Sequence, residues 1–159
     1  MHFSPLPTPR PDDLRSLARA AGAELAPVAG GALLRVHHLG PGLGALSWRP
    51  LDGLHPLEVL MGFVAPPDWR AVGVCTAGLA HRPGSTAPVR ITLLVDRGGA
   101  SASVLHHDDG AAGDEVLPGR SEGIVADACR RALGLPTRPP PQSSLPLWTA
   151  TWLDRVVTA

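Results

Sequence analysis

The sequence contains no lysine, no asparagine and no tyrosine, and only two isoleucines and two cysteines among its 159 residues. All 14 of its basic residues are therefore arginines. Arg, Ala, Gly and Pro have G- and C-rich codons, whereas Lys, Asn, Tyr and Ile have A- and T-rich ones, so this bias indicates a high-GC genome. The alternative, selection of arginine for bidentate anion binding, is less favoured because the arginines are scattered along the chain.

Other absences exclude whole classes of protein. The 14 arginines balance 14 acidic residues, and no basic cluster of the kind that non-specific nucleic-acid binders need is present. No apolar run approaches the roughly 20 residues of a membrane span, and Met1–Arg10 lacks the apolar core of a signal peptide. We therefore expect a soluble, cytoplasmic protein with no nucleic-acid or membrane partner. Cys75 and Cys129 lie far apart in apolar contexts, which predicts buried thiols without a redox role.

Length and composition predict one folded domain. A chain of this length buries about two-thirds of its unfolded surface, and 44% hydrophobic residues argue against disorder. Prolines at every second position from Pro5 to Pro11 predict that residues 1–11 form an extended arm outside any helix or strand ladder. Residues 12–159 then form the domain, with a proline-rich spacer at 136–144 before a C-terminal helix.

Three further segments have helical patterns. Asp12 and Asp13 precede a helix, and Pro56 begins a short helix that reaches Gly62. Ser121 is expected to cap a third helix, which stops at Gly134. The apolar residues of the first helix recur at helical spacing: Leu14, Leu17, Ala18, Ala21 and Leu25.

Five segments are expected to be strands: Ala32–His38, Ala45–Trp48, Ala71–Ala80, Val89–Asp96 and Ser101–His107. The last three are typical of an antiparallel meander. Gly98 and Gly99 predict a two-residue hairpin turn, which would place Ile91 opposite His106. We expect an α+β fold, in which helices cover one face of an antiparallel sheet of about four to six strands. Asp108–Gly119 is expected to be a polar loop.

The densest polar cluster begins with His106 and His107 and continues with Asp108 and Asp109. Imidazole and carboxylate groups are common ligands of zinc, iron and manganese. Adjacent strand residues point to opposite faces, so a site would use one histidine of the pair, with His81 from a neighbouring strand end. The set His81, His106, Asp108 and Asp109 therefore suggests a small metal-dependent hydrolase as an alternative. The competing interpretation is a solvated strand end, and outside this alternative no cofactor is predicted.

The C-terminal segment has a different character. Leu145, Trp148, Trp152 and Val156 follow one side of a helix that Ser144 caps, after the stiff proline spacer. These residues suit either the core face of a terminal helix or an anchor for a protein partner or a second copy of the chain. Because no catalytic constellation is convincing, the leading hypothesis is a non-enzymatic binding or regulatory module. It is expected to act through Trp148, Trp152 and Val156, with a second copy of the chain, in a homodimer, as one candidate partner.

Parts of the sequence resemble a group of known proteins. The block Pro139–Trp148, which reads PPPQSSLPLW and continues to Trp152–Arg155, is similar to segments of uncharacterised proteins of high-GC actinobacteria. The segments His55–Glu58 and Gly62–Pro67 add to this similarity. The resemblance covers about the last two-thirds of the chain. It implies no activity and no catalytic residue.

Overall fold

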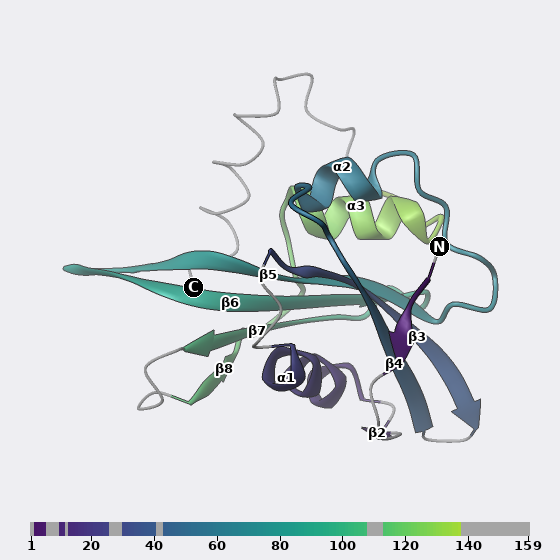
Figure 1. Cartoon of the computed structure of the whole chain (residues 1–159), viewed down its shortest axis with the longest axis horizontal. Coiled ribbons are helices and arrows are strands. Elements are labelled where there is room, and N and C mark those ends of the chain that lie inside the picture. The colour runs from purple at the N-terminus through teal and green to yellow at the C-terminus, as the bar shows by residue number, and fades with distance from the viewer. Residues whose placement is uncertain are drawn as a thin grey trace.

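The computed structural model describes residues 2–5, 10–11, 13–25, 30–40, 43–107 and 113–137. In this part of the chain, eight strands form one antiparallel sheet and three helices pack on it (Figure 1). None of these helices has the length and apolar character needed to cross a bilayer. The strands are β1 (Ser4–Pro5), β2 (Arg10–Pro11), β3 (Ala32–Gly40), β4 (Leu43–Pro50), β5 (Ala71–Arg82), β6 (Ser85–Asp96), β7 (Ser101–His107) and β8 (Asp114–Val116). The helices are α1 (Leu14–Glu24), α2 (Pro56–Leu60) and α3 (Ile124–Ala132).

The α+β class and the antiparallel sheet are confirmed. The strand order is β1-β4-β3-β5-β6-β7-β8, and β2 also pairs with β4. The strand number exceeds the expected four to six because three short strands lie at the sheet edges. One of them, β8, lies inside the segment expected to be a loop.

The N-terminal arm joins the ladder, which corrects the expectation for residues 1–11. Ser4 pairs with Trp48, and Arg10 pairs with Gly44, both on β4. Prolines are tolerated here because an edge strand leaves one side of its backbone without a ladder partner.

Helices cover both faces of the sheet, whereas the sequence was expected to place them on one. Helix α1 packs beneath β6 and β7, and α2 and α3 lie together on the opposite face (Figure 1). Along β5, Val72 and Val74 belong to the core under α3, whereas Ala71 and Cys75 belong to the core with α1. The central strands are apolar at successive positions because both of their faces are buried.

The helix caps follow local chemistry. The Asp13 carboxylate accepts hydrogen bonds from the Ser16 amide at 3.1 Å and the Ser16 hydroxyl at 2.8 Å. The bond from the Ser16 hydroxyl lowers the pKa of Asp13 below its ordinary value. Helix α3 begins after Gly123, which has a φ of 113°, and not at the expected cap Ser121. The Ser121 hydroxyl instead lies 2.6 Å from the Ser103 hydroxyl on β7.

The turn between β6 and β7 is one residue longer than predicted. The Gly99 amide bonds to the Asp96 carbonyl at 3.0 Å, and the Asp96 amide bonds to the Ala100 carbonyl at 2.9 Å. Gly99 takes a φ of 89°, so this is a three-residue loop that ends in a left-handed glycine. The register shifts by one residue as a result, and His106 lies opposite Arg90 instead of Ile91.

Arg97, at the tip of this turn, holds three segments together. Its Nε donates to the Trp69 carbonyl at 2.6 Å, and one terminal nitrogen donates to the Leu133 carbonyl at 3.2 Å. The other terminal nitrogen donates to the carbonyls of Ala65 at 3.1 Å and Pro66 at 2.6 Å. The planar guanidinium thus satisfies four carbonyls from the loop before β5 and the end of α3.

Replacing this guanidinium should be costly even when the charge is kept. We predict that Arg97→Lys lowers the free energy of unfolding by about 2–4 kcal/mol, because one ammonium cannot reach four divergent carbonyls and leaves some of them unpaired. Urea unfolding measures the loss, with Arg15→Lys on the exposed side of α1 as the control. A loss below about 0.5 kcal/mol, the usual effect of a surface change, would contradict this role.

Candidate functional site

The structure places two of the four proposed metal ligands, and they lie apart. His81 is near the distal end of β5, where its Nδ1 lies 3.2 Å from the Thr86 hydroxyl. His106 pairs with Arg90, which pairs with Ala77 on β5, so His81 lies two strands away and four residues further along. Four residues of strand span about 13 Å, which is too far for both imidazoles to bind one ion.

Asp108 and Asp109 lie outside the described residues. Among the described residues, no group of three or more His, Cys, Asp or Glu side chains is placed to hold a metal ion. The register therefore separates His81 from His106, and the two aspartates remain untested.

His106 instead belongs to a buried row of polar groups. Its side chain is 2% exposed, and its Nδ1 lies 3.0 Å from Oδ1 of Asp114, the residue directly opposite on β8. Its Nε2 lies 3.1 Å from the Thr92 hydroxyl, which in turn donates to the Cys75 sulfur at 3.4 Å. The row crosses β8, β7, β6 and β5 on the face that carries α1.

Gly22 of α1 covers this row. A Cβ added at Gly22 would overlap the His106 imidazole, so the helix approaches the ring closely because it has no side chain there. A glycine inside a helix usually weakens that helix. Here the absence of a side chain at Gly22 allows α1 to pack directly against the His106 ring.

Asp114, His106 and Thr92 follow one another in the order acid, imidazole, hydroxyl, as in a hydrolytic triad, but the Thr92 hydroxyl donates its proton to Cys75 and not to His106. A triad also needs a nucleophile that a substrate can reach, and Thr92 is fully buried. The hydrogen bonds of this row therefore supply partners for buried polar groups, and the one between His106 and Asp114 links β8 to β7. Asp114, Thr92 and Gly22 were not singled out from the sequence, because their meeting depends on the register and on β8.

Close packing between Gly22 and His106 makes the effect of one mutation depend on the other residue. We predict that Gly22→Ala lowers the free energy of unfolding by about 1–3 kcal/mol, because the methyl group overpacks against the imidazole. In a His106→Ala background the same change should be neutral or stabilising by up to about 1 kcal/mol, since alanine is the better helix former. Unfolding free energies of the native protein, the two single variants and the double variant give the cost of Gly22→Ala with and without the imidazole. Equal costs in the two backgrounds would contradict close packing of Gly22 on His106.

The two thiols are enclosed, as the sequence predicts. Both cysteines are free and buried. Burial raises the pKa of the Cys129 thiol to about 12, and burial raises the pKa of Cys75, although the bond from Thr92 opposes the change. Since the thiolate is the nucleophile, neither residue suits covalent chemistry in the folded state.

Thiol labelling tests this enclosure. We predict that a disulfide reagent at pH 8 labels neither Cys75 nor Cys129 in the folded protein and labels both in denaturant. Cys75→Ser and Cys129→Ser assign any signal to one thiol. Fast labelling of either thiol under native conditions would show that its surroundings open readily.

A hollow of about 460 Å³ lies beside α3. Its lining includes Arg120, Glu122, Asp127 and Arg130. Arg130 donates to Asp127 at 2.9 Å and also to the Ser121 carbonyl. The charges of the lining balance each other, so the hollow shows no surplus charge for a charged ligand.

Most residues in the outer part of the β5–β6 hairpin are exposed, although Ala80 is buried. The strand β3 pairs with β5 only as far as Cys75, and β7 pairs with β6 only from Val89. Residues 76–88, which we name the β5–β6 ribbon, therefore have no other strand beside them in the described part of the chain. Figure 1 shows the ribbon projecting at the left. At the usual rise of about 3.3 Å per residue, a strand of this length spans about 20 Å.

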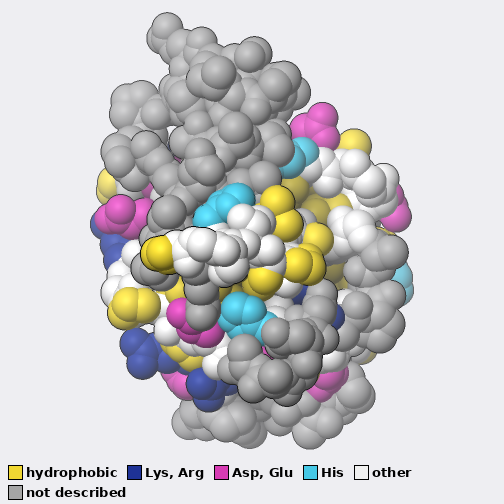
Figure 2. Space-filling view, turned by 90° about the vertical axis from the view of Figure 1, so that its left-hand side faces the viewer, with side chains coloured by type: hydrophobic (Ala, Val, Ile, Leu, Met, Phe, Trp, Pro, Cys, Tyr) yellow, Lys and Arg dark blue, Asp and Glu magenta, His cyan; other side chains and the backbone are white. Residues whose placement is uncertain are grey.

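The surface of the ribbon is uncharged apart from its tip. Leu79 is 41% exposed, and Ala77, Ala87 and Pro88 are also exposed. In sequence, the ribbon contains no acidic residue, and Arg82, next to the turn, is its one arginine. Figure 2 looks toward the ribbon from its tip and shows hydrophobic side chains gathered beside it.

The pairing of β5 with β6 determines which backbone N–H and C=O groups of the ribbon point away from the hairpin and are available for further hydrogen bonds. Arg82 pairs with Ser85 across the two-residue turn, so the backbone polar groups of even-numbered residues on β5 point to β6. The Cys75 carbonyl faces Gly31 beside β3, which agrees with this alternation. The N–H and C=O groups of Ala77, Leu79 and His81 therefore point outward along the free edge of β5.

Searches against protein-family models, curated proteins and solved structures give no match. The resemblance to actinobacterial proteins remains a prediction. Trp148, Trp152 and Val156 lie outside the described residues, so the structure does not test the proposed terminal anchor.

Proposed function

We propose that the protein is a non-enzymatic protein-interaction module of the cytoplasm, and that its partner is a second copy of the chain. The observation that carries this proposal is the free edge of β5 in the ribbon. An exposed, uncharged strand edge is a template for further strand pairing, and proteins usually blunt such edges with charges or prolines.

The two edges of the ribbon are not equivalent. On β6, Pro88 lies opposite Leu79, whose polar groups point away from β6. Pro88 therefore turns its nitrogen, which has no hydrogen, toward the outer edge of β6 and blocks pairing there. No proline interrupts β5 between Ala71 and Arg82, so β5 is the edge that can accept another strand.

Pairing with a second copy gives a defined register. Two β5 edges meet antiparallel about a two-fold axis, which we place at Leu79, so that each Leu79 lies opposite its copy and Ala77 lies opposite His81. The outward polar groups at all three positions then form hydrogen bonds between the copies. Because the ribbon carries no carboxylate and its one arginine, Arg82, is next to the turn, the two-fold axis brings no like charges together at its centre.

The hydrolase alternative has less support. Its central residue, His106, is enclosed by Gly22 and bonded to Asp114 and Thr92. The terminal anchor with Trp148 and Trp152 remains compatible with self-association, because it would add a second contact between copies.

Two variants that carry opposite charges at position 79 test the proposed register. We predict that the native chain has twice its 16.5 kDa mass by light scattering. Leu79→Lys and Leu79→Glu should each give monomers, because like charges then face each other across the axis. An equimolar mixture of the two variants should regain the dimer mass, because the charges opposite each other become complementary.

Two control variants separate the ribbon from other contacts. Ala87→Lys adds the same charge on β6, away from the β5 edge, and should leave the dimer intact. Trp152→Ala should also leave it intact if the ribbon alone is sufficient, whereas a monomer would assign the contact to the terminal helix. A native monomer, or a mixture that fails to recover the dimer, would contradict pairing at Leu79.

A further inference from the structure

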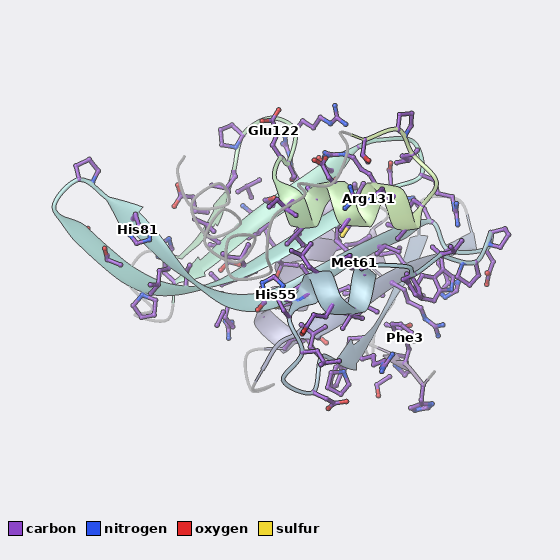
Figure 3. The ribbon with its side chains drawn as sticks, turned by 90° about the horizontal axis from the view of Figure 1, so that it is seen from above. Phe3, His55, Met61, His81, Glu122 and Arg131 are labelled. Atoms are coloured by element: carbon purple, nitrogen blue, oxygen red, sulfur yellow. The ribbon has the colours of Figure 1, made fainter. Side chains whose placement is uncertain are left out.

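A second feature lies at the other end of the sheet, where Arg35 of β3 extends its guanidinium between two aromatic rings. The central carbon of the guanidinium lies 4.3 Å from the centre of the Phe3 ring and 5.4 Å from the Trp69 ring. These rings come from the segment before β1 and the loop before β5, and they meet edge to face at 5.3 Å. In Figure 3, Phe3 lies far from His81 and the ribbon.

Arg35 differs from Arg97 and Arg130 in the polar contacts of its side chain. Arg97 donates to four carbonyls and Arg130 bonds to Asp127, but within the described part of the chain Arg35 forms no side-chain hydrogen bond or ion pair. Its Nε is buried without a partner, so a ligand cannot reach that atom, whereas the two terminal nitrogens are not buried and the side chain as a whole is half-buried. Stacking on rings stabilises the cation only in part, and its donors still favour an acceptor.

The surroundings of Arg35 favour one kind of acceptor. His37, on the same face of β3, packs edge to face on Trp69 at 6.2 Å and places its Nδ1 3.6 Å from the Asp68 carboxylate. The Asp68 carboxylate repels any anion nearby, and it repels a doubly charged phosphate more strongly than a singly charged carboxylate. The Phe63 ring lies 5.3 Å from Trp69 and is half-buried, so apolar surface continues beside the cation.

We propose that Arg35 binds the carboxylate of an apolar acid, either a small free acid or the C-terminal residue of a peptide. The two terminal nitrogens of a guanidinium present parallel N–H groups that match the two oxygens of a carboxylate. The apolar group of the acid then lies against the aromatic side chains. One guanidinium beside aromatic rings fits a monoanion better than it fits phosphate.

Binding can be followed at the indole N–H of Trp69 by two-dimensional NMR, with Trp69→Phe assigning its peak. The probes are phenylacetate, the peptide Gly-Gly-Phe, the same peptide with an amidated C-terminus, and inorganic phosphate. We expect saturable shifts with the two carboxylates at millimolar concentrations, and none with the amide or with phosphate. Tighter binding of phenylacetate would assign a free acid, and tighter binding of Gly-Gly-Phe would assign a peptide terminus.

Arg35→Lys keeps the charge but loses the paired donors, so it should weaken carboxylate binding at least tenfold. Arg15→Lys, on α1 across the sheet, should bind as the native protein does. Equal binding by Arg35→Lys, a response to the amide, or phosphate binding as tight as carboxylate binding would overturn the proposal. If Arg35→Lys does not fold, the comparison of Gly-Gly-Phe with its C-terminal amide in the native protein still tests the proposal.

Discussion

The turn between β6 and β7 controls the face of the sheet on which each β7 side chain lies. Because side chains alternate along a strand, one extra residue in this turn exchanges the two faces of β7 relative to β6. The three-residue loop closed by Gly99 brings His106 to the α1 side, where Thr92 and Asp114 supply its partners and Gly22 leaves it room. Arg97, at the tip of the loop, fixes the same turn to α3 and the loop before β5.

Much of the fold follows from periodicity. Helical spacing from Leu14 to Leu25 predicts α1, and alternation with glycine turns predicts the meander of β5, β6 and β7. The register could not be predicted in this way, because the stretch from Asp96 to Ala100 suits both a two-residue and a three-residue loop. The strand β8 is three residues long, and β1 and β2 are two each, so none carries enough alternation to be distinguished from a loop.

The candidate sites were less predictable than the fold. The hypothesis of a shared metal site for His81 and His106 assumed that both strands end at the same edge of the sheet. In the structure β5 extends well beyond the end of β7, so the two histidines lie apart along the strand direction. In the structure β5 and β6 are each 12 residues long while β7 has seven, and strands of unequal length leave a projecting hairpin. The sequence predicts only eight residues, Val89–Asp96, for β6, because Pro88 and the polar residues before it do not have the pattern of a strand. The setting of Arg35 depends on Phe3 and Trp69 coming together from distant segments, which no local pattern encodes.

Hydrogen exchange at the ribbon amides tests the central claim most directly, because strand pairing at the β5 edge changes alternate residues. In a monomer, the amides of Ala77, Leu79 and His81 face water and exchange fast, whereas those of Gly78 and Ala80 face β6. If β5 pairs with its copy, protection at the three odd-numbered amides rises with protein concentration. Fast exchange of these three amides at every concentration would contradict the account.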